Sequence, residues 1–122
     1  MKKILVTGGA GFVGSNLIKN LDAQNKFEIT SLDCYFTGKK ENHIKGINYV
    51  NSYTWDIEKI FPKTKFDVIY HFGEYSRIVK SFDDIEFVSN SILRGTPKVF
   101  DFARKCRSKI IYSGFLIISM EN

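Results

Sequence analysis

Cysteine and long hydrophobic runs are both scarce in this sequence, and each shortage excludes a class of protein. The two cysteines, Cys34 and Cys106, are too few and too far apart for a disulfide framework or a metal cluster, so reduced thiols are expected. No apolar run approaches the roughly 20 residues that a membrane-spanning helix needs. The apolar residues 4–6 imitate the start of a signal peptide, but Gly8 ends the run too early. We therefore expect a cytoplasmic protein with no metal site and no membrane segment.

The positive charge of the chain is scattered and does not form a cluster. Eighteen Lys and Arg residues against 13 Asp and Glu residues give a formal net charge of +5 over 122 residues. Such a surface tolerates phosphate groups, but a nucleic-acid interface would need a basic stripe that the sequence lacks. No nucleic-acid partner is therefore expected. A hydrophobic fraction of 43% and the absence of repeats predict one globular domain.

Strands and helices are predicted to alternate along the chain. Apolar and β-branched stretches predict strands over residues 3–7, 27–32, 47–50, 66–72 and 109–113. Helical spacing of apolar residues predicts helices over residues 12–20, 56–61 and 83–106. Pro97 predicts an interruption in the last helix. This alternation predicts an α/β fold, with an open parallel sheet of about five strands and helices on both faces.

The most informative motif is the glycine-rich segment 7–14, which reads Thr-Gly-Gly-Ala-Gly-Phe-Val-Gly. Gly8, Gly11 and Gly14 are spaced three apart between a predicted strand and a predicted helix. The first permits a tight turn, the second lets a diphosphate approach the backbone, and the third lets the helix pack closely on the sheet. The free N–H groups and positive dipole end of that helix would face the phosphates. The segment predicts a Rossmann-type dinucleotide site; the alternative is a tight turn without a ligand.

Asp33 lies 19 residues after Gly14, at the end of the second predicted strand. A carboxylate at this offset accepts hydrogen bonds from the adenosine-ribose hydroxyls and repels a 2′-phosphate. The spacing therefore favours NAD over NADP as the cofactor. Two alternatives stay open: Lys39 and Lys40 could attract a 2′-phosphate, and Asp33 could cap a loop.

On these residues the chain resembles the NAD-dependent epimerase/dehydratase family, the extended short-chain dehydrogenase/reductases that act on nucleotide sugars. The glycine loop of that family is similar to residues 7–14, and the resemblance extends over residues 2–114. It implies an NAD cofactor, a nucleotide-sugar substrate for the full-length proteins, and a cofactor site that includes Phe12 and Val13 beside the glycines.

A second family motif, Asp-x-x-x-His-x-Ala-Ala, is similar to residues 67–74 in the fourth predicted strand. The resemblance places Phe72 and Gly73 at the wall of the nicotinamide-ribose site. Gly73 and Glu74 depart from the family pattern, and the glutamate is the larger change.

Three further segments carry the resemblance with an open alternative. Asp56 and Ile57 are similar to the pair that contacts adenine, although Asp56 could equally cap a helix. Asn90 and residues 95–96 resemble the family's Asn…Gly-Thr helix, with a longer gap. Arg77 follows the fourth strand, where it could meet a sugar-nucleotide phosphate or remain a solvated surface residue.

The catalytic residues that the resemblance implies are missing. Family members have a Ser or Thr after the fifth strand and a Tyr-x-x-x-Lys pair on the next helix. Phe115 stands where the Ser or Thr is expected, and the residue four beyond Tyr112, the last tyrosine, is Leu116. His43 is expected in a loop and His71 in the core, so neither supplies the base that the sugar hydroxyl needs. We assign no catalytic residue and expect the chain to be inactive alone.

The chain is expected to comprise an incomplete NAD(P)-binding domain over residues 1–114 and an atypical apolar tail over residues 115–122. A natural truncation before the substrate lobe, a frameshift and an artificial end all stay open. The missing strands would leave the edge of the fifth strand open beside the apolar tail, which predicts a homodimer. Two functions follow: an NAD-binding N-terminal fragment of a nucleotide-sugar epimerase/dehydratase, or a stand-alone NAD-binding or regulatory module that acts with a partner chain.

Overall fold

The computed structural model of the chain describes residues 1–72, 91–112 and 116–119. Its strands form one six-stranded sheet in the order β3-β2-β1-β4-β5-β6. Strands β1 to β5 run parallel to their neighbours, whereas β6 pairs with β5 in the antiparallel direction. The strand bounds are β1 Lys2–Thr7, β2 Phe27–Asp33, β3 Asn48–Asn51, β4 Val68–His71, β5 Lys109–Tyr112 and β6 Leu116–Ser119.

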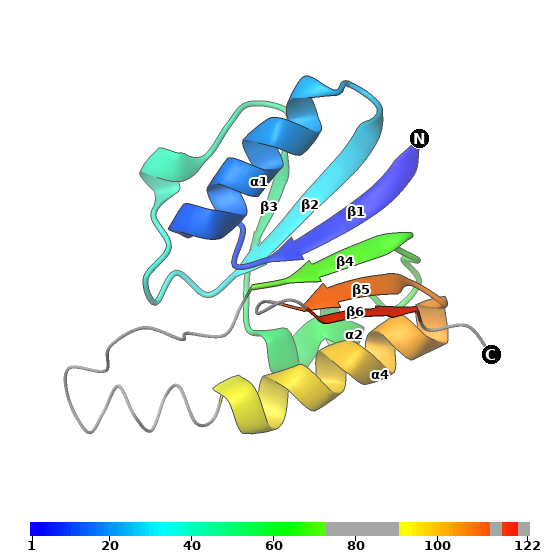
Figure 1. Ribbon diagram of the computed structural model, residues 1–122. Helices are drawn as coiled ribbons and strands as arrows, with labels where there is room; N and C mark the ends of the chain where they lie inside the picture. Colours follow the sequence, from blue (N-terminus) through cyan, green and yellow to red (C-terminus); the bar gives the residue numbers. More distant parts are fainter. Residues whose placement is uncertain (73–90, 113–115, 120–122) are drawn as a thin grey trace.

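Helices cover both faces of this sheet (Figure 1). Helix α1 lies on one face, and α2 and α4 lie on the other. The bounds are α1 Phe12–Ala23, α2 Ile57–Ile60 and α4 Thr96–Cys106, with the 3-10 turns η1 Lys40–Asn42 and η2 Thr54–Asp56 and the π-helical turn η3 Ser91–Gly95. The predicted α/β fold with a Rossmann-type parallel sheet is therefore confirmed, with β6 added at one edge.

Strand β1 is buried on both faces because it lies inside the sheet, between β2 and β4. Successive side chains of a strand point to opposite faces. Ile4 and Val6 accordingly pack in the core beneath α1, whereas Leu5 packs in the core beneath α2 and α4. This two-sided burial explains why the strand is a continuous apolar run in the sequence.

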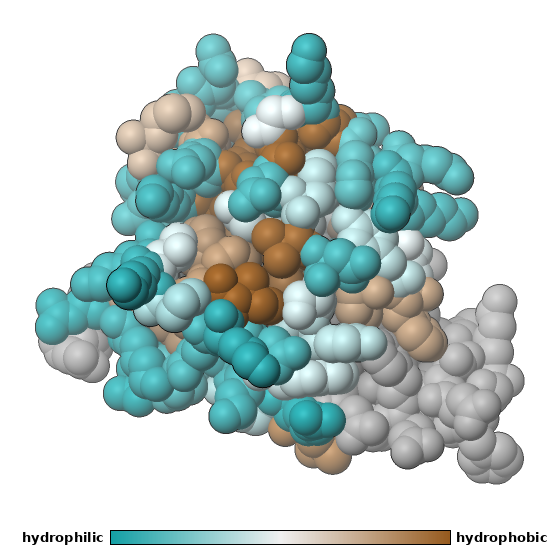
Figure 2. Space-filling view, turned by 180° about the vertical axis from the view of Figure 1, so that it is seen from behind, coloured by the Kyte–Doolittle hydropathy of each residue, from teal (hydrophilic) through white to brown (hydrophobic). Residues whose placement is uncertain are grey.

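The surface behind the view of Figure 1 is mostly hydrophilic, and its hydrophobic patches lie toward the middle of that face (Figure 2). Apart from the terminal Met1, the most exposed large apolar side chains among the described residues are three: Phe12 at 70%, Val13 at 58% and Leu93 at 73% exposed. Two of these three begin α1, directly after the glycine-rich segment.

The strand order reverses between β1 and β4. From β1 the chain builds outward through β2 to β3, then returns across the sheet to β4 and continues to β5 on the other side. The carboxyl ends of β1 and β4 therefore flank the crevice where ligands bind in open α/β sheets.

Helix α4 begins at Thr96, within the helix predicted over residues 83–106. Pro97 occupies the first turn of α4, where its missing N–H costs no intrahelical hydrogen bond. The π-helical turn η3 directly precedes α4, which agrees with the interruption predicted at Pro97. The helix ends at Cys106, and its C-cap residue Arg107 adopts the left-handed conformation (φ 57°). Residues 83–90 of the predicted helix lie outside the described residues.

The prediction that the edge of β5 is open is wrong. Leu116–Ser119, part of the predicted tail, forms β6 and pairs with Lys109–Tyr112 along the whole of β5. An antiparallel neighbour needs only a short connection, so the chain can cover its own edge with the residues that directly follow β5.

The described residues contain no helix that is long and apolar enough to cross a membrane. They also contain no group of three or more His, Cys, Asp and Glu side chains that could hold a metal ion. Cys34 and Cys106 are both half-buried. The glycine-rich turn between β1 and α1 lies at the strand-order reversal and is the principal candidate for a functional site.

The core beneath α4 provides a test of the fold. Ile69 in β4 is fully buried in this core, whereas Leu93 is 73% exposed. We expect Ile69→Ala to lower the free energy of unfolding by about 2–5 kcal/mol, because it removes buried methylene groups and leaves a cavity. Leu93→Ala is the control and should change it by less than about 0.5 kcal/mol. Urea denaturation followed by circular dichroism measures both, and equal effects would contradict the assigned core.

Candidate functional site

The glycine-rich segment forms a tight turn between β1 and α1. The N–H of Gly8 donates to the carbonyl of Leu32 at 2.8 Å, and the N–H of Gly11 donates to the carbonyl of Gly8 at 3.1 Å. Gly11 is the N-cap of α1, and no side chain caps the helix. The first-turn N–H groups of an α-helix have no intrahelical partner. The turn therefore presents the amino end of α1, with its positive dipole, at the carboxyl edge of β1.

Two glycines of the turn differ in how strictly the fold requires them. A Cβ atom on Gly14 would lie 2.1 Å from the carbonyl oxygen of Gly8, so a side chain there is incompatible with this turn. A Cβ atom on Gly11 would lie 3.3 Å from the same oxygen, which needs only a small adjustment. The fold itself thus demands glycine at position 14, whereas position 11 tolerates a side chain unless a ligand approaches it from outside.

Asp33 lies at the end of β2, where only 5% of it is exposed. Its Oδ2 accepts a hydrogen bond from the N–H of Ala10 at 2.9 Å, and its Oδ1 accepts one from the N–H of Tyr35 at 2.8 Å. The loop-capping role considered for this residue is therefore present. An ionised carboxylate has about four acceptor positions, so these two bonds leave capacity for hydroxyl donors.

The loop after β2 folds back over the glycine turn. The N–H of Lys39 donates to the carbonyl of Ala10 at 3.0 Å, and the Nδ2 of Asn42 donates to the same oxygen at 2.7 Å. The sequence predicts this stretch only as a loop and gives no indication of these contacts. They fix the position of Lys39 and Lys40, whose side chains are exposed.

Aromatic side chains stiffen the same loop. Tyr35 Oη lies 2.5 Å from His43 Nε2, and the His43 ring stacks on Tyr49 with 3.7 Å between centroids. Burial raises the pKa of Tyr35, and the neighbouring Asp33 carboxylate raises it further. Tyr35 is therefore a neutral phenol beside the Asp33 carboxylate. His43 is a loop residue, as predicted, and its ring is part of this cluster.

Asp56 and Ile57 lie at the junction of η2 and α2. Asp56 occupies the N-cap position of α2, but its carboxylate makes no capping hydrogen bond. Ile57 is fully buried in the core beneath α4, so only its backbone can face a ligand. The half-exposed Asp56 carboxylate is thus available for a contact other than the cap.

The end of β4 lies against the start of the glycine turn. The N–H of Phe72 donates to the carbonyl of Thr7 at 3.1 Å. His71 is fully buried, with Nδ1 2.7 Å from Thr7 Oγ1 and Nε2 3.1 Å from Thr96 Oγ1. The interpretation of His71 as a core histidine is therefore confirmed, because both ring nitrogens have hydroxyl partners.

Several predicted positions lie outside the described residues: Gly73, Glu74, Arg77, Asn90 and Phe115. The remaining predicted positions lie near the ends of four neighbouring strands. The glycine turn follows β1, Phe72 follows β4, Asp33 ends β2, and Asp56 and Ile57 come after β3. Parallel strands end at one edge, so the structure brings these positions to a single side of the sheet.

This combination defines a class of protein: a Rossmann-type domain with a dinucleotide-type glycine turn at its strand-order reversal. Within that class, the chain belongs to the NAD dependent epimerase/dehydratase family, whose model matches residues 4–115. The family resemblance drawn from the glycine and Asp-x-x-x-His motifs is thus confirmed.

Three relatives illustrate the range of the family. UDP-glucuronic acid decarboxylase 6 of Arabidopsis thaliana is 33% identical over 113 residues, which cover 89% of this chain and 32% of that protein. The UDP-glucose 4-epimerase of Thermus thermophilus, in complex with NAD, has a TM-score of 0.77 and 28% identity, covering 88% of this chain and 36% of the other. The enzyme WbmG of Bordetella bronchiseptica, in complex with NAD and UDP, has a TM-score of 0.75 and 27% identity. That match covers 89% of this chain and 36% of WbmG. The chain therefore spans about a third of the length of these relatives.

The two glycine positions provide a matched pair of variants. We expect Gly14→Ala to lower the free energy of unfolding by about 1–3 kcal/mol, because the new methyl group overlaps the Gly8 carbonyl. Gly11→Ala should change it by less than about 1 kcal/mol, because the extended backbone of Gly11 suits alanine and the space is nearly sufficient. Urea denaturation checks both values, and a Gly14→Ala protein as stable as the wild type would refute the geometry of the turn.

Proposed function

We propose that this chain binds NAD at the glycine turn, as the cofactor-binding part of a nucleotide-sugar epimerase/dehydratase. One observation carries the proposal: the uncapped amino end of α1 lies beside Gly11, which the fold does not require to be glycine, and beside the Asp33 carboxylate. Backbone N–H groups at a helix start suit a diphosphate, and the carboxylate suits a ribose.

The residues that would hold the two halves of NAD follow from this geometry. Gly8, Gly11 and Gly14 shape the turn, and a diphosphate group would be seated on the N–H groups of Phe12 and Val13 at the start of α1.

Asp33, Asp56 and the backbone of Ile57 would hold the adenosine half of the cofactor. Phe72 and Gly73 would line the nicotinamide ribose, with Gly73 outside the described residues. The nicotinamide, when bound, supplies the hydride acceptor for sugar oxidation. This chain would bind and orient it.

NAD is proposed over NADP because the Asp33 carboxylate would lie against a 2′-phosphate. The NAD complex of the Thermus thermophilus epimerase supports the same choice. Lys39 and Lys40 could oppose this preference for NAD by attracting a 2′-phosphate. The hydrogen bond from the Lys39 N–H to the Ala10 carbonyl holds their loop beside the glycine turn.

Calorimetric titration tests the cofactor proposal. We expect the wild-type chain to bind NAD more tightly than NADP, and Gly11→Ala to weaken NAD binding about tenfold or more, which corresponds to about 1.4 kcal/mol. Asp33→Asn should weaken NAD binding and narrow the difference in affinity between NAD and NADP. Asp22→Asn, on the exposed side of α1, is the matched control. No heat of binding at millimolar NAD would refute the proposal.

We also propose that the chain alone does not turn over nucleotide sugars. Oxidation of a sugar hydroxyl needs a base, and both ring nitrogens of His71 already have hydroxyl partners in the core. Tyr112 lies in β5, and Leu116 four residues later lies in β6, so this tyrosine is not part of a Tyr-x-x-x-Lys helix. Purified protein with NAD and UDP-, dTDP- and GDP-sugars should give no product above the uncatalysed rate. Epimerisation or dehydration at enzyme-like rates would contradict this.

A second candidate is an NAD-binding or regulatory module that completes its site with a partner chain. Strand β6 favours this second candidate. It covers the edge of β5 with residues of the chain itself. In either case the cytoplasmic location expected from the sequence stays a prediction.

We propose that the chain forms a homodimer by pairing of the outer edges of two β6 strands. Strand β6 is last in the strand order, so its outer edge has no neighbour within the described part of the sheet. An exposed apolar edge strand is a template for pairing with a second copy. Sedimentation velocity should reveal a concentration-dependent dimer, and Ile117→Lys should shift the equilibrium toward monomer. A wild-type monomer at all concentrations would refute the dimer.

A further inference from the structure

The amino end of α4 meets the turn η2 at a point that the proposed NAD site does not include. Gly95, the N-cap of α4, is buried against Thr54, the first residue of η2. Asp56, the proposed adenosine contact, ends that same turn. We call the contact between Gly95 and Thr54 the α4 joint. It lies at the carboxyl edge of the sheet, as the glycine turn does, because η2 follows β3 and η3 precedes α4.

The α4 joint requires glycine for space and not for backbone conformation. Gly95 has φ −78° and ψ −49°, which are helical values that alanine adopts readily. A Cβ atom there would lie 2.1 Å from Thr54 Oγ1, well inside van der Waals contact. It would lie 3.3 Å from Thr54 Cβ, which needs only a small adjustment. The hydroxyl oxygen of Thr54 is therefore the atom that excludes a side chain at position 95.

The α4 side of the joint is anchored in the core, so an added side chain would displace η2. Thr96 Oγ1 lies 3.1 Å from Nε2 of the fully buried His71. Val99, one turn further along α4, is fully buried in the core. Thr54 and Asp56 are the two ends of a single 3-10 turn. A displacement of Thr54 is therefore passed on to Asp56.

A second, more exposed contact joins the same two turns. The guanidinium carbon of Arg94 lies 4.7 Å from the centroid of the Trp55 ring, and the Tyr53 ring stacks on Trp55 at 4.4 Å with an interplanar angle of 5°. A cation over the face of an indole is attracted by the negative face of the ring. Arg94 directly precedes Gly95, and Trp55 directly follows Thr54. The stack therefore supports the α4 joint from the surface.

We propose that Gly95 is a positioning residue for the adenosine half of the cofactor. Its missing side chain lets Thr54 approach α4, and this approach holds Asp56 where its carboxylate accepts a hydrogen bond from adenine. The Asp56 carboxylate makes no capping hydrogen bond, so its position depends on the turn that carries it. The inference rests on the proposed NAD site and adds a residue that acts on it through η2.

Calorimetric titration of the full chain with AMP, which carries the adenosine half of NAD, tests the role of Gly95. We expect Gly95→Ala to weaken AMP binding about tenfold, which corresponds to about 1.4 kcal/mol. Adding Thr54→Ala to Gly95→Ala should restore most of the lost affinity. The obstructing oxygen is then gone, and only the 3.3 Å contact with the Cβ atom of residue 54 remains.

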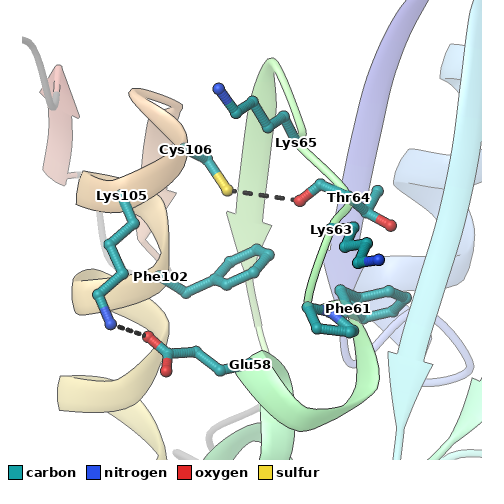
Figure 3. A pocket seen from close by; sticks show the side chains of 9 residues that line it. Glu58, Phe61, Lys63, Thr64, Lys65, Phe102, Lys105 and Cys106 are labelled. Atoms are coloured by element: carbon teal, nitrogen blue, oxygen red, sulfur yellow. Dashed lines mark hydrogen bonds and ion pairs between the residues drawn. The ribbon is translucent and has the colours of Figure 1, made fainter.

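A double-mutant cycle with Asp56 separates positioning from a general loss of structure. If Gly95 acts through Asp56, Gly95→Ala should change AMP affinity little in a chain that already carries Asp56→Ala. A general loss of structure would instead add in full to the effect of Asp56→Ala. Phe102→Leu is the control for stability, because Phe102 packs near Phe61 beside a hollow of about 340 Å³ at the other end of α4 (Figure 3). It should destabilise the chain and leave AMP affinity unchanged.

The fluorescence of Trp55, the only tryptophan of the chain, gives a readout that needs no ligand. Gly95→Ala should shift its emission to longer wavelength, because η2 moves away from α4 and the ring becomes more exposed, and Thr54→Ala should reverse the shift. If Gly95→Ala does not fold, Arg94→Gln tests the joint from the exposed surface. It should shift the emission and lower AMP affinity, whereas Lys98→Gln, which removes the same charge at an exposed position of α4, should do neither.

The outcomes distinguish this inference from the proposed function. A wild-type chain that binds neither NAD nor AMP would overturn both. A wild-type chain that binds both ligands would leave the proposed function standing. In that case the role of Gly95 is overturned if Gly95→Ala binds AMP as tightly as the wild type, if Thr54→Ala restores nothing, or if the effects of Gly95→Ala and Asp56→Ala add in full.

Discussion

The close approach of α1 to the end of β1 is the constraint on which the rest of this structure depends. It exists because Gly14 has no side chain, since a Cβ atom there would meet the Gly8 carbonyl at 2.1 Å. Only with the helix in this position does its uncapped amino end face the crevice between β1 and β4. The loop after β2 then closes over the turn through the Ala10 carbonyl. A local packing requirement thereby creates an anion-accepting edge.

Asp33 connects this turn to the neighbouring strand. Its two oxygens accept hydrogen bonds from the N–H groups of Ala10 and Tyr35, so one carboxylate holds both the glycine turn and the loop after β2. The same group is the proposed partner of the adenosine ribose. These roles are compatible because a carboxylate has more acceptor positions than the backbone uses. The alternatives of loop cap and ribose ligand are therefore not exclusive.

The sheet separates two kinds of surface. At the carboxyl edge, backbone N–H groups and a nearly buried carboxylate are arranged around a turn. At the amino edge, Lys63, Lys65 and Lys105 line one hollow together with Phe61 and Phe102. The lysines look scattered in the sequence, and 40 residues separate the last two. They line the same hollow because the parallel topology returns the end of α4 to the edge where β4 begins.

The sequence alone determined the glycine turn, the position of Asp33, the alternation of strands and helices and the family. These are local patterns: glycines spaced three residues apart, a carboxylate 19 residues after the last of them, and runs of apolar residues. Each can be read along the chain without knowledge of the fold. Only the tertiary structure decided that β6 covers β5, that the Ala10 carbonyl anchors a distant loop, and that three separate lysines share a pocket. Such contacts join residues far apart along the chain. Their formation depends on strand order and helix direction, which no single stretch of sequence encodes.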